Sequence, residues 1–211
     1  MAETQIKEKL LHGGLIGTIG AIQFVIFSAL AMVFYTGGTA WNHNAVGYTF
    51  WLNMFSDLGR TVSYSGEINT VSSIIFNFAL TLFGASLFAF YFALPTTIHR
   101  NRSLIATFRI IGFVSAAGMI LIGVSPDDIL SEFHMIGVWV WAIPLFIVSV
   151  LTAYSGLRVK KRYGLLSVGL ALLVGVHIGQ GLADMWGPII PITQKIVVYY
   201  NVIWILYLNH R

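Results

Sequence analysis

The chain has 211 residues, of which 57% are hydrophobic and 9% are charged, and its formal net charge is +4. Soluble domains usually carry about 25% charged residues, and a soluble chain of this size has too much surface to hide so many apolar side chains. The chain has no cysteine, which excludes disulfides, thiolate metal sites and cysteine nucleophiles.

Six apolar segments reach the roughly 20 residues that a helix needs to cross a bilayer. We therefore predict an all-α, polytopic membrane protein that forms a single domain over residues 1–211. The first segment is interpreted as a retained anchor and not as a signal peptide, because its apolar run is long and no small-residue cleavage site follows it. The predicted helices cover residues 13–36, 70–94, 104–124, 132–155, 164–186 and 189–208.

The basic residues predict how the helices cross the membrane. Ten of the twelve Lys and Arg residues fall at one predicted face and two at the other. Because loops rich in Lys and Arg stay in the cytoplasm, both termini are predicted to be cytoplasmic. The basic residues are spread over short loops and form no patch for nucleic acid, so we expect no nucleic-acid partner. The loops predicted to face outward are 37–69, 125–131 and the turn near 187.

The first outward loop contains an unusual segment, residues 45–58, which is apolar and aromatic but too short to span a bilayer. This pattern is typical of a helix or a re-entrant turn that lies at the membrane interface. Gly59 is expected to end the segment. The arrangement would bring Ser56 and Asp57 against the outer ends of the other helices.

Acidic residues and histidines also gather toward the predicted outer face. Loop solvation accounts for Asp127, but it does not account for His177 and Asp184, which lie inside an apolar segment where polar groups usually serve a function. These two residues are seven positions apart, almost two helical turns, so they are expected to share one face with Gln180. With His134 and Asn77 on neighbouring helices, they predict a polar cavity in the outer leaflet. The residues of this outer group are His43, Asp57, Glu67, Asp127, Asp128, Glu132, His134, His177 and Asp184.

Three interpretations of this group stay open. In the first, His134, His177 and Asp57 bind a divalent metal such as zinc, which would activate water, although no local metal motif supports this. In the second, the cavity holds a lipid head group, with Arg60 and Lys195 binding its phosphate. In the third, the same side chains only join helices by hydrogen bonds.

Several short motifs resemble a known family. They are Phe55-Ser56-Asp57-Leu58-Gly59, Phe76-Asn77 and Pro126-Asp127 followed by His134. Together they resemble the prokaryotic membrane family catalogued as domain of unknown function 998, which is similar in plan to the Frag1/DRAM/Sfk1 group of six-helix proteins. The resemblance covers nearly the whole chain, although Ser125-Pro126 stands where Phe-Pro is more typical. It implies that Ser56, Asp57, Asn77, Asp127 and His134 are the functional positions, and it implies no particular activity.

We therefore expect a protein of the prokaryotic cytoplasmic membrane that binds or processes a lipid or another amphiphile. If it is an enzyme, hydrolysis is the expected reaction. Two alternatives are a non-catalytic subunit, with a membrane-protein partner or as a homo-oligomer, and a small transporter, which would need broken helices. The catalytic candidates are Ser56, Asp57, Asp127 and His134, and the ligand-binding candidates are Arg60, Asn77, Gln180, Asp184 and Lys195.

Overall fold

The computed structural model describes residues 2–99, 101–185 and 187–209, and six of its helices are long and apolar enough to cross a membrane. The predicted all-α fold with six spanning helices is confirmed, and no strand forms in the described part of the chain. Its inside-outside orientation stays a prediction from the charge bias. The helices are α1 (Ala2–Phe34), α2 (Thr70–Ile98), α3 (Arg102–Val124), α4 (Ser131–Val159), α5 (Lys161–Leu182) and α6 (Ile189–Asn209).

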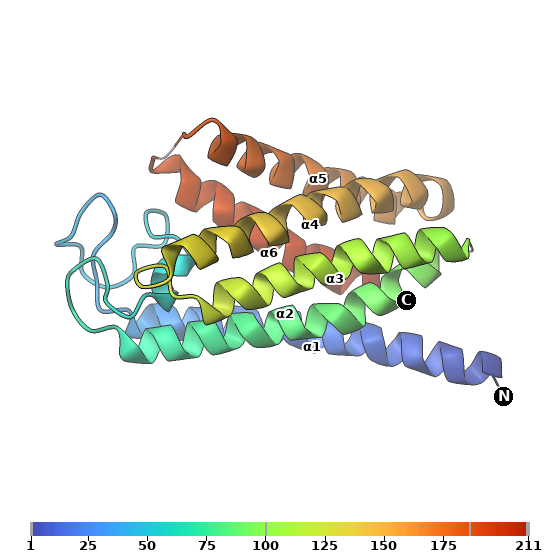
Figure 1. The fold of residues 1–211 in the computed structure, drawn as a ribbon, viewed down its shortest axis with the longest axis horizontal. Helices are drawn as coiled ribbons and strands as arrows, with labels where there is room; N and C mark the ends of the chain where they lie inside the picture. Colours follow the sequence, from blue (N-terminus) through green and yellow to red (C-terminus); the bar gives the residue numbers. More distant parts are fainter. Residues whose placement is uncertain (1, 100, 186, 210–211) are drawn as a thin grey trace.

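The helices lie side by side along the long axis of the molecule (Figure 1). Each helix packs against the next one in the chain, and α1 also contacts α6, so the bundle closes on itself. The long loop between α1 and α2 lies at one end, together with the α3–α4 and α5–α6 connections (Figure 1). The first and last described residues lie at the opposite end. This arrangement brings the predicted outward loops together.

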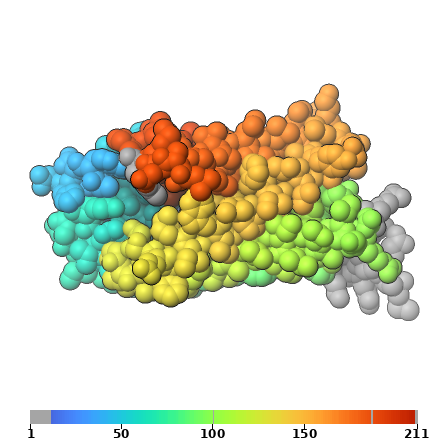
Figure 2. Space-filling view, turned by 45° about the horizontal axis from the view of Figure 1, so that its top comes forward, coloured from blue at the N-terminus to red at the C-terminus, as the bar shows by residue number. Residues whose placement is uncertain are grey.

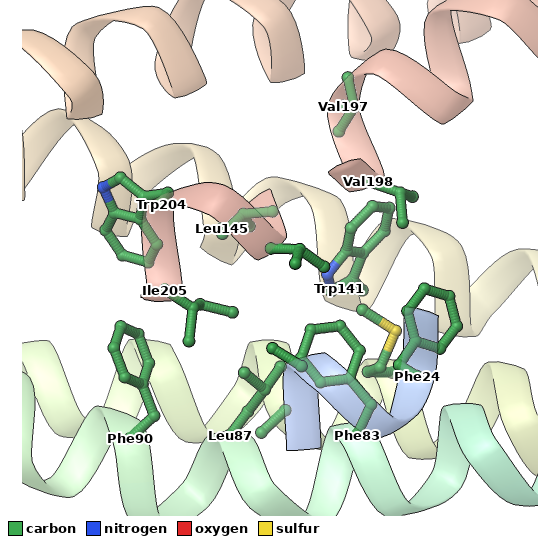
Figure 3. Close-up of a cluster of buried hydrophobic side chains, with 14 of the residues drawn as sticks. Phe24, Phe83, Leu87, Phe90, Trp141, Leu145, Val197, Val198, Trp204 and Ile205 are labelled. Carbon is green, nitrogen blue, oxygen red and sulfur yellow. The ribbon is translucent and has the colours of Figure 1, made fainter. Parts of the chain in front are cut away.

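The bundle core is apolar and rich in aromatic rings (Figure 3). Phe24 of α1 stacks on Phe83 of α2 with ring centroids 5.2 Å apart. Trp204 of α6 is fully buried, and its indole Nε1 donates a hydrogen bond of 2.8 Å to the hydroxyl of Ser167 on α5. Phe55 of the long loop stacks on Phe76 of α2 at 6.3 Å, so the loop is anchored in the same core.

The long loop, whose residues are all described, has little regular structure. It contains the 3-10 turn η1 (Ser56–Gly59) and two isolated backbone bridges, Gly37 to Val46 and Val62 to Ile68. The segment predicted over residues 45–58 is thus a folded turn and not a regular helix, and η1 ends at Gly59 as expected. Leu58 is fully buried, and this end of the bundle is covered by loop side chains.

One predicted helix boundary is wrong in a way that affects the site. Helix α5 ends at Leu182 and not at residue 186, because Asp184 takes a left-handed backbone conformation with φ 52°. The amide of Met185 donates to the carbonyl of Gln180 at 3.0 Å and that of Asp184 donates to Gly181 at 3.3 Å. This pair of bonds is typical of a Schellman motif, which ends a helix.

Candidate functional site

A cavity of ≈ 350 Å³ lies at the loop-bearing end of the bundle. It is bounded by the long loop, the α3–α4 connection and the neighbouring ends of α4, α5 and α6. Figure 2 shows these segments gathered at one end of the molecule. The volume falls in the range of small-molecule sites, about 300–1,000 Å³. The cavity is lined by five of the predicted site residues, which are Ser56, Asp57, Asp127, His134 and His177.

Asp57 is the most buried acid of the cavity, with 4% of its surface exposed. Its Oδ2 accepts hydrogen bonds of 2.9 Å from Asn53 Nδ2 and from the amide of Met54. Burial raises the pKa of Asp57 to about 6, and these hydrogen bonds and the charges of Arg60 and Lys195 limit the rise. The pKa of the Asp57 carboxyl group is thus about two units above that of an ordinary aspartate.

His134 lies in the first turn of α4 and is 5% exposed. Its Nδ1 is 2.8 Å from the carbonyl oxygen of Ser125, which only accepts, so Nδ1 carries the proton. In the neutral ring Nε2 is then a free acceptor. A histidine held in this way has the tautomer that a general base needs.

His177 of α5 is held by Thr193 of α6, which is in turn bonded to Gln180 of α5. Its Nδ1 lies 3.2 Å from the hydroxyl of Thr193, which donates to Gln180 Oε1 at 2.8 Å. Because the hydroxyl proton is given to Gln180 (or to the carbonyl of Ile190, at 3.1 Å), the neutral His177 donates from Nδ1 and keeps Nε2 as an acceptor. Gln180 therefore fixes the orientation of the His177 ring through Thr193, although Gln180 itself does not line the cavity.

The two cations predicted to bind phosphate are already engaged. Arg60 pairs with Asp127 at 3.1 Å, and its guanidinium lies 4.3 Å from the ring centroid of Tyr64. Lys195 is 1% exposed, and its Nζ donates to the carbonyls of Asn53 and Pro191. In this geometry Arg60 and Lys195 hold the loop, and their predicted binding of a ligand phosphate stays a prediction.

Two further predicted ligand-binding residues lie outside the cavity lining. Asn77 Nδ2 donates to the carbonyl of Gly59 at 3.0 Å and to the hydroxyl of Ser73, which ties η1 to α2. Asp184 is exposed beyond the end of α5 and does not share the face of His177. The physical reason is the Schellman motif at the end of α5, since a left-handed residue points its side chain away from the preceding helical stripe.

The predicted metal set is not assembled. Among the described residues, no three His, Cys, Asp or Glu side chains come close enough to hold a metal ion. His134, His177 and Asp57 line one cavity but use one edge each for bonds to Ser125, Thr193 and Asn53. These three side chains therefore do not converge on one ion.

Sequence reasoning missed Gln194 and the aromatic walls. Gln194 Oε1 accepts the amide of Phe55 at 2.8 Å and lines the cavity from α6. The aromatic walls are Trp41, Tyr64 and Trp139. The interruption of the last apolar segment at Gln194 was a usable signal, whereas three scattered aromatics in an aromatic-rich chain gave none.

A smaller pocket of ≈ 50 Å³ continues from the cavity toward the bundle core. It shares Ser56, His134 and His177 with the cavity, and its other walls are mostly apolar. Trp141, whose ring appears in Figure 3, lines this pocket, and its buried Nε1 has no hydrogen-bond partner among the described residues. The combined space is mostly apolar, and the acidic side chains Asp57 and Asp127 line only its wide part.

The fold and cavity define a class: an integral membrane protein of six spanning helices with a ligand-sized cavity at one end. The motifs that carry the family resemblance converge there, since Phe55 stacks on Phe76, Asn77 binds Gly59, and Asp57 and His134 line one cavity. No protein-family model, curated protein or solved structure matches the chain. The resemblance to the family of domain of unknown function 998 stays a proposal that rests on these motifs.

Proposed function

We propose that the protein binds an amphiphile, such as a membrane lipid, in this cavity at the outer face of a prokaryotic cytoplasmic membrane. The observation that supports the proposal is a ligand-sized cavity with mostly apolar walls, which carries a few polar side chains such as Asp57, His134 and His177 and continues into a narrow apolar extension. Protein interiors are close-packed, so helix packing alone gives no reason for a void of this size. Its two parts suit the head group and the first carbons of a chain.

Retention of a ligand during purification tests this proposal. Ala142 is buried in the cavity wall, so Ala142→Leu fills part of the space, while Ala29→Leu adds the same atoms on the exposed face of α1. Native mass spectrometry is expected to find one bound amphiphile on the wild type and on Ala29→Leu, and little on Ala142→Leu. Equal retention by both variants, or none by the wild type, would contradict it; other chains co-purifying with an empty protein would favour an accessory subunit.

Hydrolysis is the second candidate, and the anchored ring of His134 favours it. In this reaction His134 Nε2 takes a proton from water while the water oxygen attacks an ester carbonyl. The proton then passes to the departing alkoxide, which leaves a carboxylic acid and an alcohol. His134→Gln is expected to abolish cleavage of a short-chain 4-nitrophenyl ester and to leave the retained amphiphile in place. Unchanged cleavage would exclude His134 as the base.

A further inference from the structure

The head-group end of the cavity offers acceptors to a ligand, and no Lys or Arg is among the described residues that line it. Asp57 Oδ1 makes no hydrogen bond within the described part of the chain, because both recorded donors bind Oδ2. His134 and His177 each use Nδ1 for a bond to the protein, which leaves Nε2 on each ring. All three residues line the same cavity.

The cations near this end are oriented elsewhere. Arg60 is shared between Asp127 and the face of Tyr64, and Lys195 lies behind the loop with its ammonium on backbone carbonyls. Both charges act on Asp57 from within the protein, but neither side chain lines the cavity, so an anionic head group would meet the Asp57 carboxylate with no Lys or Arg side chain beside it. A cationic head group would meet that carboxylate together with the Nε2 acceptors of His134 and His177.

Aromatic side chains complete the wall. Trp41 and Trp139 line the same cavity as Asp57, whereas the ring of Tyr64 is already covered by Arg60 and His43. The face of an aromatic ring attracts a cation, and the attraction grows when the site is desolvated. Carboxylate and aromatic rings are the wall composition by which proteins recognise ammonium groups.

We propose that the ligand of this cavity is an amphiphile with an ammonium head group, for which Asp57 is the counter-ion and Trp41 and Trp139 are the aromatic walls. The inference rests on the proposed amphiphile site and specifies its ligand class. It differs from the phosphate-binding cavity expected from sequence, because it assigns Arg60 and Lys195 to holding the loop and not to the ligand.

Three probes of equal chain length test the inference: octylammonium, octyl sulfate and octyl glucoside. The full chain in detergent is titrated with each at neutral pH, and the fluorescence of the cavity tryptophans is followed. Octylammonium is expected to saturate the signal at a concentration at least about tenfold lower than the other two probes, because it alone pairs with the carboxylate.

Matched variants locate the effect. Asp57→Asn keeps an acceptor for Asn53 and Met54 and is expected to weaken octylammonium binding about tenfold or more. Asp184→Asn removes an exposed acid outside the cavity, keeps a residue that tolerates the left-handed backbone, and is expected to bind as the wild type does. Trp139→Leu supplies a second test of the wall should Asp57→Asn not fold.

The outcomes separate this inference from the proposed function. Octyl sulfate or octyl glucoside binding as tightly as octylammonium, with loss on Ala142→Leu, would overturn the ammonium inference and leave an amphiphile site. Octylammonium binding that is equal in the wild type, Asp57→Asn and Trp139→Leu would also overturn it. Saturation by none of the probes would count against both.

Discussion

Glycines pack tightly where α1, α2 and α3 meet and loosely at the C-terminal end of α5. Between α1 and α2 and between α2 and α3, glycines let the backbones approach closely: a Cβ on Gly17 would lie 2.9 Å from Phe90 Cβ, and one on Gly84 would lie 2.9 Å from the Ile120 amide nitrogen. At the end of α5, a Cβ on Gly179 would meet nothing within 4 Å, and one on Gly181 would meet only the Trp139 ring. Glycines also bring α4 and α5 together at their other ends, where Gly156 meets Gly164, so only the C-terminal end of α5, next to the cavity, is left open.

The largest effect is expected from Asp57, the buried acid of the cavity, on the pH dependence of stability. The pKa of Asp57 rises from about 4 in the unfolded chain to about 6 in the fold, so the folded state holds the proton more tightly. Its contribution to stability is then greatest below about pH 4, falls by about 3 kcal/mol as pH rises to about 6, and is level above that pH. Thermal unfolding at a series of pH values measures this loss.

Asp57→Asn isolates that contribution from its neighbours. The charges of Arg60 and Lys195 act on Asp57, and three tyrosines, Tyr35, Tyr48 and Tyr64, also interact with it. His134 and His177 line the same cavity. The amide that replaces the carboxyl group does not titrate, so the variant is expected to lack the decline between about pH 4 and about pH 6. A decline of the same size in the variant would show that Asp57 is not its source.

Adding a methyl group to one glycine of each region tests the contrast between the α2–α3 contact and the C-terminal end of α5. Gly84→Ala forces a Cβ against α3 backbone and is expected to cost about 2 kcal/mol by overpacking. Gly179→Ala meets open space and is expected to be neutral or to stabilise α5 by up to about 1 kcal/mol, because alanine favours helix. Similar melting temperatures for the two variants would show that α2 around Gly84 and α5 around Gly179 are packed equally tightly.

Removal of the His134 ring is expected to have a moderate effect. His134→Ala takes away the donor to the Ser125 carbonyl, and leaving that group without its partner costs about 1–2 kcal/mol. His43→Ala is the control, since His43 is exposed. Equal stability of the two variants would mean that the Ser125 contact does not fix the start of α4.

The smallest effect is expected at the cavity rim. Arg60 and Asp127 are 18% and 27% exposed, and solvent weakens the attraction between such charges. A double-mutant cycle with Arg60→Gln and Asp127→Asn is expected to give a coupling of about 0.5 kcal/mol and no more than about 1 kcal/mol. A larger coupling would show that the rim is closed from water.

The fold could be predicted because each spanning segment carries its own signal in length and polarity. The loop could not, since its shape comes from contacts distant in sequence: Phe55 binds Gln194, and Asn53 binds Lys195. Glycine patterns were equally uninformative. Gly13-x-x-x-Gly17 packs on α2, whereas Gly179 of the same pattern in α5 faces open space.

Half of the candidate site was predictable because its polar residues stand out within or beside apolar segments. Polar residues in or beside apolar segments, such as His134 and His177, line the cavity because burial in a bundle needs a polar environment. Spacing does not show a local stop or a distant partner: Asp184 lies past a Schellman motif, and Arg60 and Lys195 hold the loop.

Photoaffinity mapping tests the central claim most directly. The full chain is irradiated with an octylammonium derivative that carries a diazirine on its alkyl chain, and the labelled peptides are identified by mass spectrometry. The account predicts labels on cavity residues of α4 and α5, such as Val138 and Ile178, and their loss when unlabelled octylammonium competes. Labels spread over the exposed outer faces of the helices, with no competition, would contradict a ligand site in the cavity.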